Sequence, residues 1–306
     1  MGIERFKFAA ILLAATLLAG GCHAATIVRA PADGTERIVS LAPSVTETLF
    51  AIGAGPQVVG VSQYCDYPPA ARKLPSVGTF LTPNIEAIAA LRPTVVIGPL
   101  TSSDLREMRA LRAMGITTVA VGGDDSILQI EHSIEQIGDR TGRAAAARRL
   151  LAGIRLSMRS IEERLNRRPV RSVLMVVGHQ PMVAVGRGTY LDQLLALARG
   201  ANIADASAQA WPRLSLEYII ASRPDVILDG QMGTDPSTPD SFWLKYPSIP
   251  AVKNRRVCGY PEDPTLHPGP RIGSTLEILA RLIHPEAFAA GALCPKFIAP
   301  IGKASQ

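Results

Sequence analysis

A helix-then-strand phrase occurs twice in this chain, and it limits the possible folds more than any other part of the sequence. The first copy is NIEAIAALRPTVVIG, residues 84–98, and the second is SLEYIIASRPDVILDG, residues 215–230. Each copy starts with a helix-capping residue, continues as an amphipathic helix that an Arg-Pro pair ends, and closes with an apolar run typical of a strand. Such a repeat predicts two similar α/β lobes.

Both copies place a glutamate in the first helical turn, Glu86 and Glu217. The glutamate lies about 100° around the helix from the shared apolar stripe, so we expect both side chains to face solvent. The helix dipole favours such a carboxylate by about 0.3–1 kcal/mol, which would explain each glutamate without any function. Alternatively, the two form a matched acidic pair, one per lobe, for a partner with two-fold or pseudo-two-fold symmetry and basic sockets.

The stretch between the two copies predicts a connector. Residues 142–168 contain no proline, and their apolar residues recur at steps of three and four, as in one helix of about 25 residues. This is too short for the several heptads of a coiled coil. We therefore expect two Rossmann-like α/β lobes with central parallel sheets, joined by one long rigid α-helix. The predicted segments are an export signal (1–24), a tether (25–36), an N-terminal lobe (37–141), the connecting helix (142–168), a C-terminal lobe (169–290) and a tail (291–306).

The segment SVTETLFAIGAG, residues 44–55, predicts a helix near the start of the first lobe. Ser44 and Glu47 have the S-x-x-E spacing of a capping box, in which the glutamate would bond back to the helix start. Gly53 and Gly55 predict where this helix ends.

The N-terminus indicates an exported protein. Residues 1–21 combine an early Arg5 and Lys7 with a short apolar stretch and small residues, which is typical of a signal peptide. The stretch ending at Cys22 resembles a lipoprotein box, so Cys22 could carry lipid; ordinary cleavage after Ala24 is the alternative. We expect contact with a membrane only through such a lipid or through a membrane partner.

The remaining cysteines and the net charge limit which metal sites and partners the sequence allows. If Cys22 is lipidated, Cys65, Cys258 and Cys294 remain, which allows one disulfide whose pairing the spacing does not select. The absence of a CxxC motif argues against structural zinc. The formal charge of +6 is spread along the chain without a basic stripe, so no nucleic-acid partner is expected.

An exported α/β hydrolase is the enzymatic alternative. The sequence has no G-x-S-x-G elbow, no H-E-x-x-H motif and no P-loop. His179 follows a predicted strand, but no nucleophile is paired with it in the sequence. We expect a protein that is not an enzyme and has no catalytic residues.

Five stretches of the chain resemble the periplasmic substrate-binding components (class III, helical backbone) of ABC importers for cobalamin, iron-siderophore and haem complexes, and most of all the cobalamin-binding members. They are RIVSLAPSVTETLFAIGAG, VVGVSQYCDYPP, VGTFLTPNIEAIAALRPTVVIG, AWPRLSLEYIIASRPDVILDG and PGPRIGSTLEILARLIHPE. The resemblance implies a ligand cleft between the lobes, a connecting helix that limits their movement, and a periplasmic location. It also implies a permease dimer with ATPase subunits as partner, with Glu86 and Glu217 docking on permease arginines.

Three aromatic residues are the candidate walls of the ligand site. Aromatic residues make up only 5% of the chain, yet Tyr64, Phe80 and Trp211 all lie in loops at strand or helix ends, where α/β sheets place ligands. Packing within a lobe would explain any one of them. The resemblance places all three at cleft-lining positions, with Phe80 where the family can carry tryptophan.

The proline-rich segment YPEDPTLHPGPR, residues 260–271, is the candidate rim. The resemblance puts Asp263 at a position that hydrogen-bonds the ligand rim, and His267 where cobalamin-binding members carry arginine. Histidine can hydrogen-bond an amide or ligate cobalt or iron, and a plain loop role is its alternative. Arg271 is expected near the rim. Cys65 is a second candidate for a soft ligand, although a buried or disulfide-bonded cysteine is the simpler interpretation.

The expected cargo is a small metal chelate, and no cofactor is expected. Cobalamin is the favoured ligand, with haem or a ferric siderophore as the alternative. Siderophores are anionic and usually need several cations, whereas only Arg187, Arg213 and Arg271 lie near the predicted rim. Haem remains open because Tyr64 or His267 could supply an axial ligand.

Overall fold

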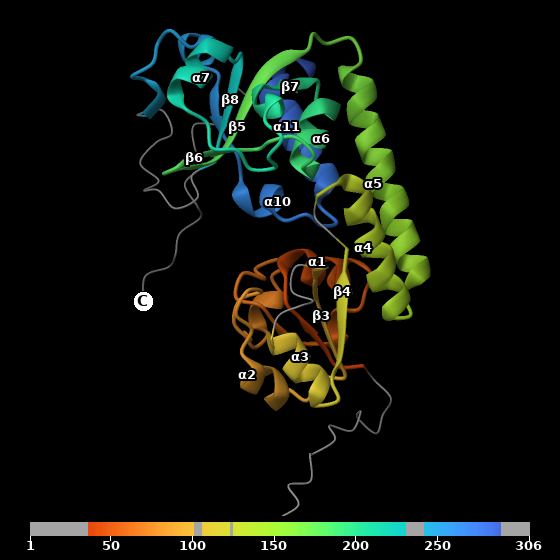
Figure 1. Cartoon of the computed structure of the whole chain (residues 1–306). Helices are drawn as coiled ribbons and strands as arrows, with labels where there is room; N and C mark the ends of the chain where they lie inside the picture. The colour runs from red at the N-terminus through yellow and green to blue at the C-terminus, as the bar shows by residue number, and fades with distance from the viewer. Residues whose placement is uncertain (1–35, 101–105, 123–124, 231–241, 289–306) are drawn as a thin grey trace, which may run out of the picture.

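The computed structural model describes residues 36–100, 106–122, 125–230 and 242–288. Two α/β lobes lie one above the other, and a pair of long helices runs along one side of both (Figure 1). None of the helices in these ranges is long and apolar enough to cross a membrane. The expected export signal, the tether up to residue 35, Cys22, Cys294 and the tail from residue 291 lie outside the described residues.

The N-terminal lobe is built on a four-stranded parallel sheet. Its order is β2 (Val58–Val61), β1 (Ile38–Ser40), β3 (Val95–Pro99) and β4 (Thr117–Val121). Alternate residues of β1 and β3 enter two separate cores, so the sheet is covered on both faces as predicted. Its helices are α1 (Pro43–Ala51), α2 (Ile85–Ala90) and α3 (Arg106–Ala113), with short 3-10 turns η1 (Gly55–Gln57) and η2 (Ala71–Lys73).

The C-terminal lobe has a five-stranded sheet around β5 (Arg171–His179) and β8 (Val226–Asp229). Strands β9 (Val257–Gly259) and β7 (Gly200–Asn202) are parallel to their neighbours, while β6 (Met182–Ala184) pairs antiparallel with β5, a departure from the all-parallel prediction. The remaining elements are α6 (Tyr190–Leu197), η4 (Ile203–Ala206), α7 (Leu216–Ser222), α9 (Pro250–Lys253), α10 (Glu262–Leu266), α11 (Ile272–Ile283) and η5 (Pro285–Ala287).

The repeated phrase folds the same way in both lobes. The side chain of Asn84 accepts a hydrogen bond from the Ala87 amide at 2.9 Å, and Ser215 accepts one from the Tyr218 amide at 3.2 Å, so both predicted caps are confirmed. Arg92 and Arg223, the residues before the two prolines, both have φ of 47°, a left-handed conformation that ends each helix. Each copy then supplies an interior strand, β3 or β8.

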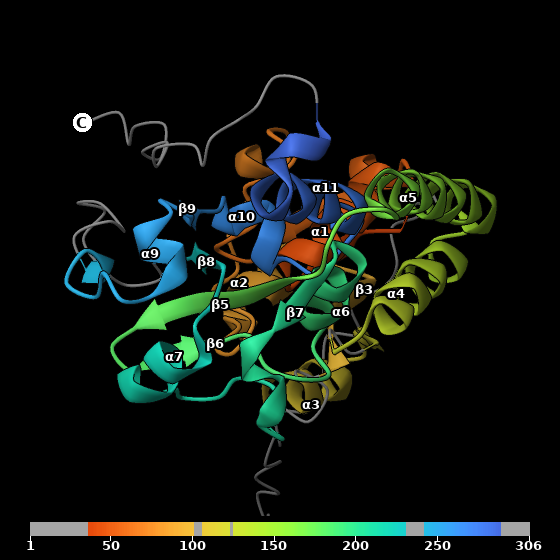
Figure 2. The same ribbon diagram turned by 90° about the horizontal axis from the view of Figure 1, so that it is seen from above.

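The connection between the lobes is a helical hairpin. The predicted long helix is α5 (Ala144–Leu165, 22 residues), and it is preceded by α4 (Ile127–Arg140), which the sequence analysis did not identify. Seen from above, the two helices lie side by side (Figure 2). α5 packs on α4 and also on α11, and its buried stripe joins the core shared by both lobes. The lobes are thus braced along one side.

Candidate functional site

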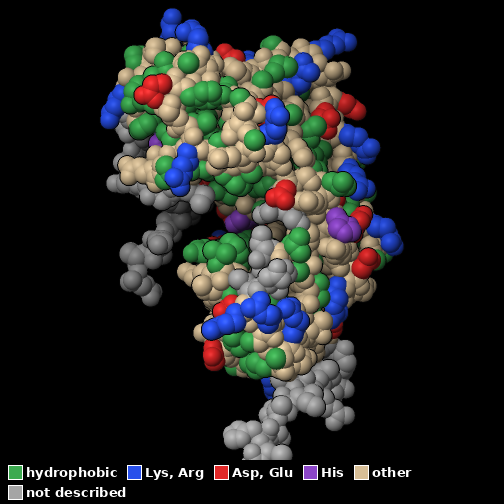
Figure 3. All heavy atoms as spheres, viewed as in Figure 1, with side chains coloured by type: hydrophobic (Ala, Val, Ile, Leu, Met, Phe, Trp, Pro, Cys, Tyr) green, Lys and Arg blue, Asp and Glu red, His purple; other side chains and the backbone are tan. Residues whose placement is uncertain are grey.

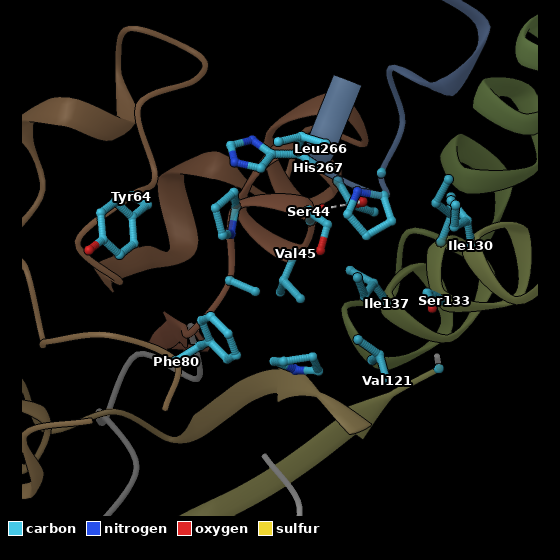
Figure 4. Close-up of a pocket in the computed structure, with 18 of the residues that line it drawn as sticks. Ser44, Val45, Tyr64, Phe80, Val121, Ile130, Ser133, Ile137, Leu266 and His267 are labelled. Atoms are coloured by element: carbon cyan, nitrogen blue, oxygen red, sulfur yellow. Dashed lines mark hydrogen bonds between the residues drawn. The ribbon is translucent and has the colours of Figure 1, made fainter. Parts of the chain in front are cut away.

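A cavity of about 730 Å³ lies where the two lobes meet (Figure 4). Residues of α1, of the loops after β2 and before α2, of β4 and of α4 line it from the N-terminal side, and the α10–α11 segment lines it from the C-terminal lobe. The space-filling view shows the hollow between the lobes (Figure 3). A cleft between the lobes was expected, although α4 was not expected to form one of its walls.

The walls of this cavity are mostly apolar. Figure 4 shows Tyr64 and Phe80 on one side, with Val121, Ile130 and Ile137 opposite them. An apolar cavity with aromatic walls suits a broad, flat, largely apolar ligand.

Two of the three predicted aromatic residues therefore line the cavity. Tyr64 is 55% exposed. Phe80 lies on a tight turn that the Gly78–Pro83 bridge closes; Gly78 has φ of +91°, and a Cβ there would meet the Thr82 carbonyl oxygen at 2.7 Å. This turn fixes the direction in which Phe80 points.

The third aromatic residue, Trp211, does not line the cavity, although it is 47% exposed on the C-terminal lobe. It precedes Glu217 by six residues, as Phe80 precedes Glu86, so the repeat places the two aromatics at equivalent positions. Its role in ligand binding stays a prediction.

The polar side chains on the cavity are four hydroxyls, three carboxylates and one imidazole. Asp66, Glu262, Asp263 and His267 lie on it, and no Lys or Arg does so among the described residues. Two of the arginines expected near the rim are already paired: Arg187 with Asp205 at 2.7 and 3.0 Å, away from the cavity, and Arg271 with Asp263 of the rim and with Glu47, as described below. Arg213 lines a different surface hollow beside α7. The rim is therefore acidic.

The α10 segment that carries the rim is held firmly by its own lobe. The Tyr190 hydroxyl of α6 donates a hydrogen bond to the Thr265 carbonyl at 2.7 Å, and the Thr275 hydroxyl of α11 donates one to the Pro264 carbonyl at 2.8 Å. Gly269 then passes so close to α1 that a Cβ there would lie 3.2 Å from the Ser44 Cα. These contacts fix Asp263 and His267 at the edge of the cavity.

A buried glutamate from the other lobe meets this rim. Glu47 of α1 is 2% exposed, and its carboxylate accepts hydrogen bonds from Nε and a terminal nitrogen of Arg271. The same Arg271 donates to Asp263 at 2.8 Å, and its guanidinium lies over the Tyr67 ring, 4.4 Å from the centroid. His267 Nδ1 lies 3.3 Å from both Glu47 and Asp263.

Arg271 stays protonated in this cluster. Burial alone would lower its pKa, but the hydrogen bonds and charges of Glu47 and Asp263 outweigh burial, so the pKa of Arg271 is raised above its ordinary value. Arg271 is thus a permanent internal cation that balances carboxylates from both lobes.

The capping box predicted for Ser44 and Glu47 is wrong. Helix α1 begins after Ala42 with no side-chain cap, and Glu47 turns away from the helix start to pair with Arg271. A local motif could not reveal this role, because the partner lies 224 residues away in the sequence.

Two other candidates point away from the cavity. Cys65 is a free, buried thiol within hydrogen-bonding distance of Thr46 and Ser62, both at 3.1 Å, so it faces the interior of its lobe and is not a ligand of the cavity. Cys258 is disulfide-bonded. His179 lies 2.7 Å from the buried Asp229 and does not line the cavity.

Glu86 and Glu217 are both exposed, as predicted, and lie on helices α2 and α7 of different lobes (Figure 1). A backbone hydrogen bond within Glu217 and a hydrogen bond from Ser215 lower the pKa of the Glu217 carboxyl. Both helices lie far from α5, which borders the opposite side of the molecule (Figure 1).

The profile of the periplasmic binding protein family matches residues 38–264, most of the chain. The chain belongs to this family. The match spans both lobes, the connecting hairpin and the segment up to Pro264 of α10, so it covers most of the elements that form the cavity.

Individual relatives agree with this assignment. The vitamin B12-binding protein of Yersinia pestis (strain Pestoides F) is 27% identical over 227 residues, covering 74% of this chain and 81% of the relative. Among solved structures, the periplasmic vitamin B12 binding protein BtuF of Vibrio cholerae superposes with a TM-score of 0.70 at 26% identity, covering 82% and 97% of the two chains.

A haem-binding relative matches equally well. The periplasmic heme-binding protein RhuT of Roseiflexus sp. RS-1, solved without ligand, superposes with a TM-score of 0.73 at 30% identity, covering 83% of this chain and all of that one. The predicted architecture of two α/β lobes is confirmed, and the protein groups with substrate-binding transport proteins, not with enzymes.

Proposed function

We propose that this protein is the substrate-binding component of an ABC importer and captures cobalamin in the cavity between its lobes. One observation carries the choice: the cavity joins apolar and aromatic walls to three carboxylates, without a cation among the described lining residues. A corrin ring has an apolar body, and the amides around its edge can donate to these acceptors.

The same rim disfavours anionic chelates. The propionates of haem and the charged groups of ferric siderophores would approach Asp66, Glu262 and Asp263, and like charges in a partly desolvated site repel one another. Arg271 offers little relief, because Glu47 and Asp263 already occupy its guanidinium. A neutral, amide-rich chelate meets no such repulsion.

Haem is the second candidate, on a different observation. Tyr64 and His267 both line the cavity, and each can bind ferric iron. The match to a haem-binding relative at 30% identity supports keeping this candidate.

The proposed function also requires that the loaded protein deliver its ligand to a membrane permease. Glu86 and Glu217 would dock on basic sockets of a permease dimer, which works with ATPase subunits, and a charge-assisted contact on each lobe would fix the orientation of the protein. The protein would act in the periplasm, free or held at the membrane by a lipid on Cys22.

Titration calorimetry with purified protein tests the cargo. We expect cyanocobalamin to bind with a dissociation constant in the nanomolar to low micromolar range, roughly −8 to −12 kcal/mol. Haemin and a ferric siderophore, titrated under the same conditions, should bind more weakly. Heat from haemin alone, with none from any corrinoid, would replace cobalamin by the second candidate.

A further inference from the structure

His267 is the one histidine among the described residues that lines the cavity. It lies beside Leu266 at the edge formed by the α10–α11 segment of the C-terminal lobe, while Tyr64 lines the cavity from the N-terminal lobe (Figure 4). A metal-binding group at this place would reach into the space that the apolar walls enclose.

The surroundings of its ring select one tautomer. Nδ1 lies 3.3 Å from a carboxylate oxygen of Glu47 and 3.3 Å from one of Asp263, and both oxygens can only accept while the carboxylates are ionised. The nearby Arg271 nitrogen is farther, at 3.5 Å. Nδ1 therefore carries the hydrogen, and Nε2 keeps its lone pair. Within the described ranges no hydrogen bond occupies Nε2.

We propose that Nε2 of His267 is an axial ligand for the metal of the bound planar chelate, and that Glu47 is the positioning residue that prepares it. This inference rests on the proposed function and adds the chemistry of one bond. Metal-binding histidines commonly donate their other ring N–H to a carboxylate, which fixes the ring and strengthens the donor nitrogen. Glu47 and Asp263 form that arrangement here.

The step is a simple ligand exchange. On a chelate whose metal holds a water, such as aquacobalamin, the metal–oxygen bond breaks, the Nε2 lone pair forms a metal–nitrogen bond, and the water leaves. No electron is transferred, and the Nδ1 hydrogen stays in place. Cyanocobalamin carries a strongly held cyanide instead of water, so it provides a matched ligand on which this exchange does not occur.

The groups around Nδ1 come from both lobes. His267 and Asp263 belong to the C-terminal lobe and Glu47 to the N-terminal lobe, so the second carboxylate at Nδ1 is present only while the lobes are apposed as in this structure. Arg271, which donates to both Glu47 and Asp263, holds the two carboxylates in place without removing their charge.

The test combines absorbance spectra and calorimetry on the purified exported chain. Wild type should shift the visible bands of aquacobalamin on binding and bind it about tenfold or more tightly than cyanocobalamin. His267→Gln should remove both the shift and this preference while still binding cyanocobalamin. His132→Gln, at an exposed histidine on α4, should behave as wild type.

Glu47 is tested through its effect on the same bond. Glu47→Gln should lower the affinity for aquacobalamin by about 10–100-fold, leave that for cyanocobalamin nearly unchanged, and be partly rescued in Glu47→Asp. Circular dichroism checks that each variant is folded. If Glu47→Gln does not fold, the His267→Gln result alone decides whether His267 coordinates the metal. Corrinoid binding without a spectral shift in wild type would overturn the coordination but leave the proposed function standing. No binding of any corrinoid would overturn both the proposed cargo and this coordination.

Discussion

The guanidinium of Arg271 in the C-terminal lobe donates to both carboxylate oxygens of Glu47 in the N-terminal lobe, so one ion pair spans the two halves of the molecule. The Glu47 side chain is 1% exposed and that of Arg271 16%, so solvent screens the pair only slightly. Removing one partner should leave a charge in a place that water hardly reaches.

We therefore expect Arg271→Met to lower the free energy of unfolding by about 3 kcal/mol, the lower end for breaking a buried pair. The double variant Glu47→Gln/Arg271→Met should recover part of this loss, because no uncompensated charge remains. Urea unfolding measures both. As a control, Arg281→Met removes an exposed pair with Glu277 and should change stability by about 1 kcal/mol or less. Equal losses in both single variants would mean that burial does not matter here.

The two exposed glutamates should matter for transport and not for binding. Glu86→Ala/Glu217→Ala should retain the calorimetric affinity for cyanocobalamin, because neither residue lines the cavity. The same variant should lose uptake in cells that express the cognate permease, because the charged docking contacts are gone. Glu162→Ala/Glu163→Ala, which removes two exposed glutamates from α5, is the matched control and should transport normally. Weaker ligand binding in the first double variant would move these residues into the ligand site.

Trp211 should contact the ligand from the C-terminal lobe if it is equivalent to Phe80. Trp211→Ala should then weaken cobalamin binding about tenfold, comparable with Phe80→Ala, since an aromatic wall contributes area and stacking. Leu244→Ala, at a residue of the same lobe that is 67% exposed, serves as control. An unchanged affinity for Trp211→Ala would confine the ligand to the cavity walls of Tyr64 and Phe80.

Stability should fall on mild acidification because of His284. Its side chain is fully buried, and burial lowers its pKa below the ordinary 6.5, although Glu286 acts in the opposite direction. The unfolded chain binds the proton more readily, so the contribution is complete above pH 6.5 and is lost as pH falls through the lower folded-state pKa. Thermal unfolding at pH 7.5 and 5.5 should show a smaller loss for His284→Gln than for wild type. The exposed variant His132→Gln should retain the wild-type loss.

The free thiol of Cys65 should react slowly in the native protein. Burial raises its pKa, and hydrogen bonds from Ser62 and Thr46 offset this only in part, so little thiolate forms at pH 8. Titration with a thiol-specific chromogenic disulfide should detect this group only after denaturation. The late signal should be missing in Cys65→Ser. A rapid native reaction that this variant abolishes would show that Cys65 is accessible after all.

Local sequence was sufficient for the two copies of the repeated phrase, for helix α5 and for the exposed glutamates. Caps at Asn84 and Ser215, breaks before Pro93 and Pro224, and the apolar strands that follow are short-range features, and each is present in the structure. The proline-free stretch likewise predicted α5, because helical periodicity is visible in the sequence without knowledge of the partner helices.

The tertiary structure alone decided which side chains meet. It turned Glu47 from a supposed cap into the partner of Arg271, made the missed helix α4 a wall of the cavity, left Trp211 outside that cavity, and turned Cys65 inward. Periodicity shows which face of an element is apolar, but it does not show which distant residue will face it. Glu47 and Arg271 meet only because the α4–α5 hairpin and the close passage of Gly269 over α1 hold the lobes together.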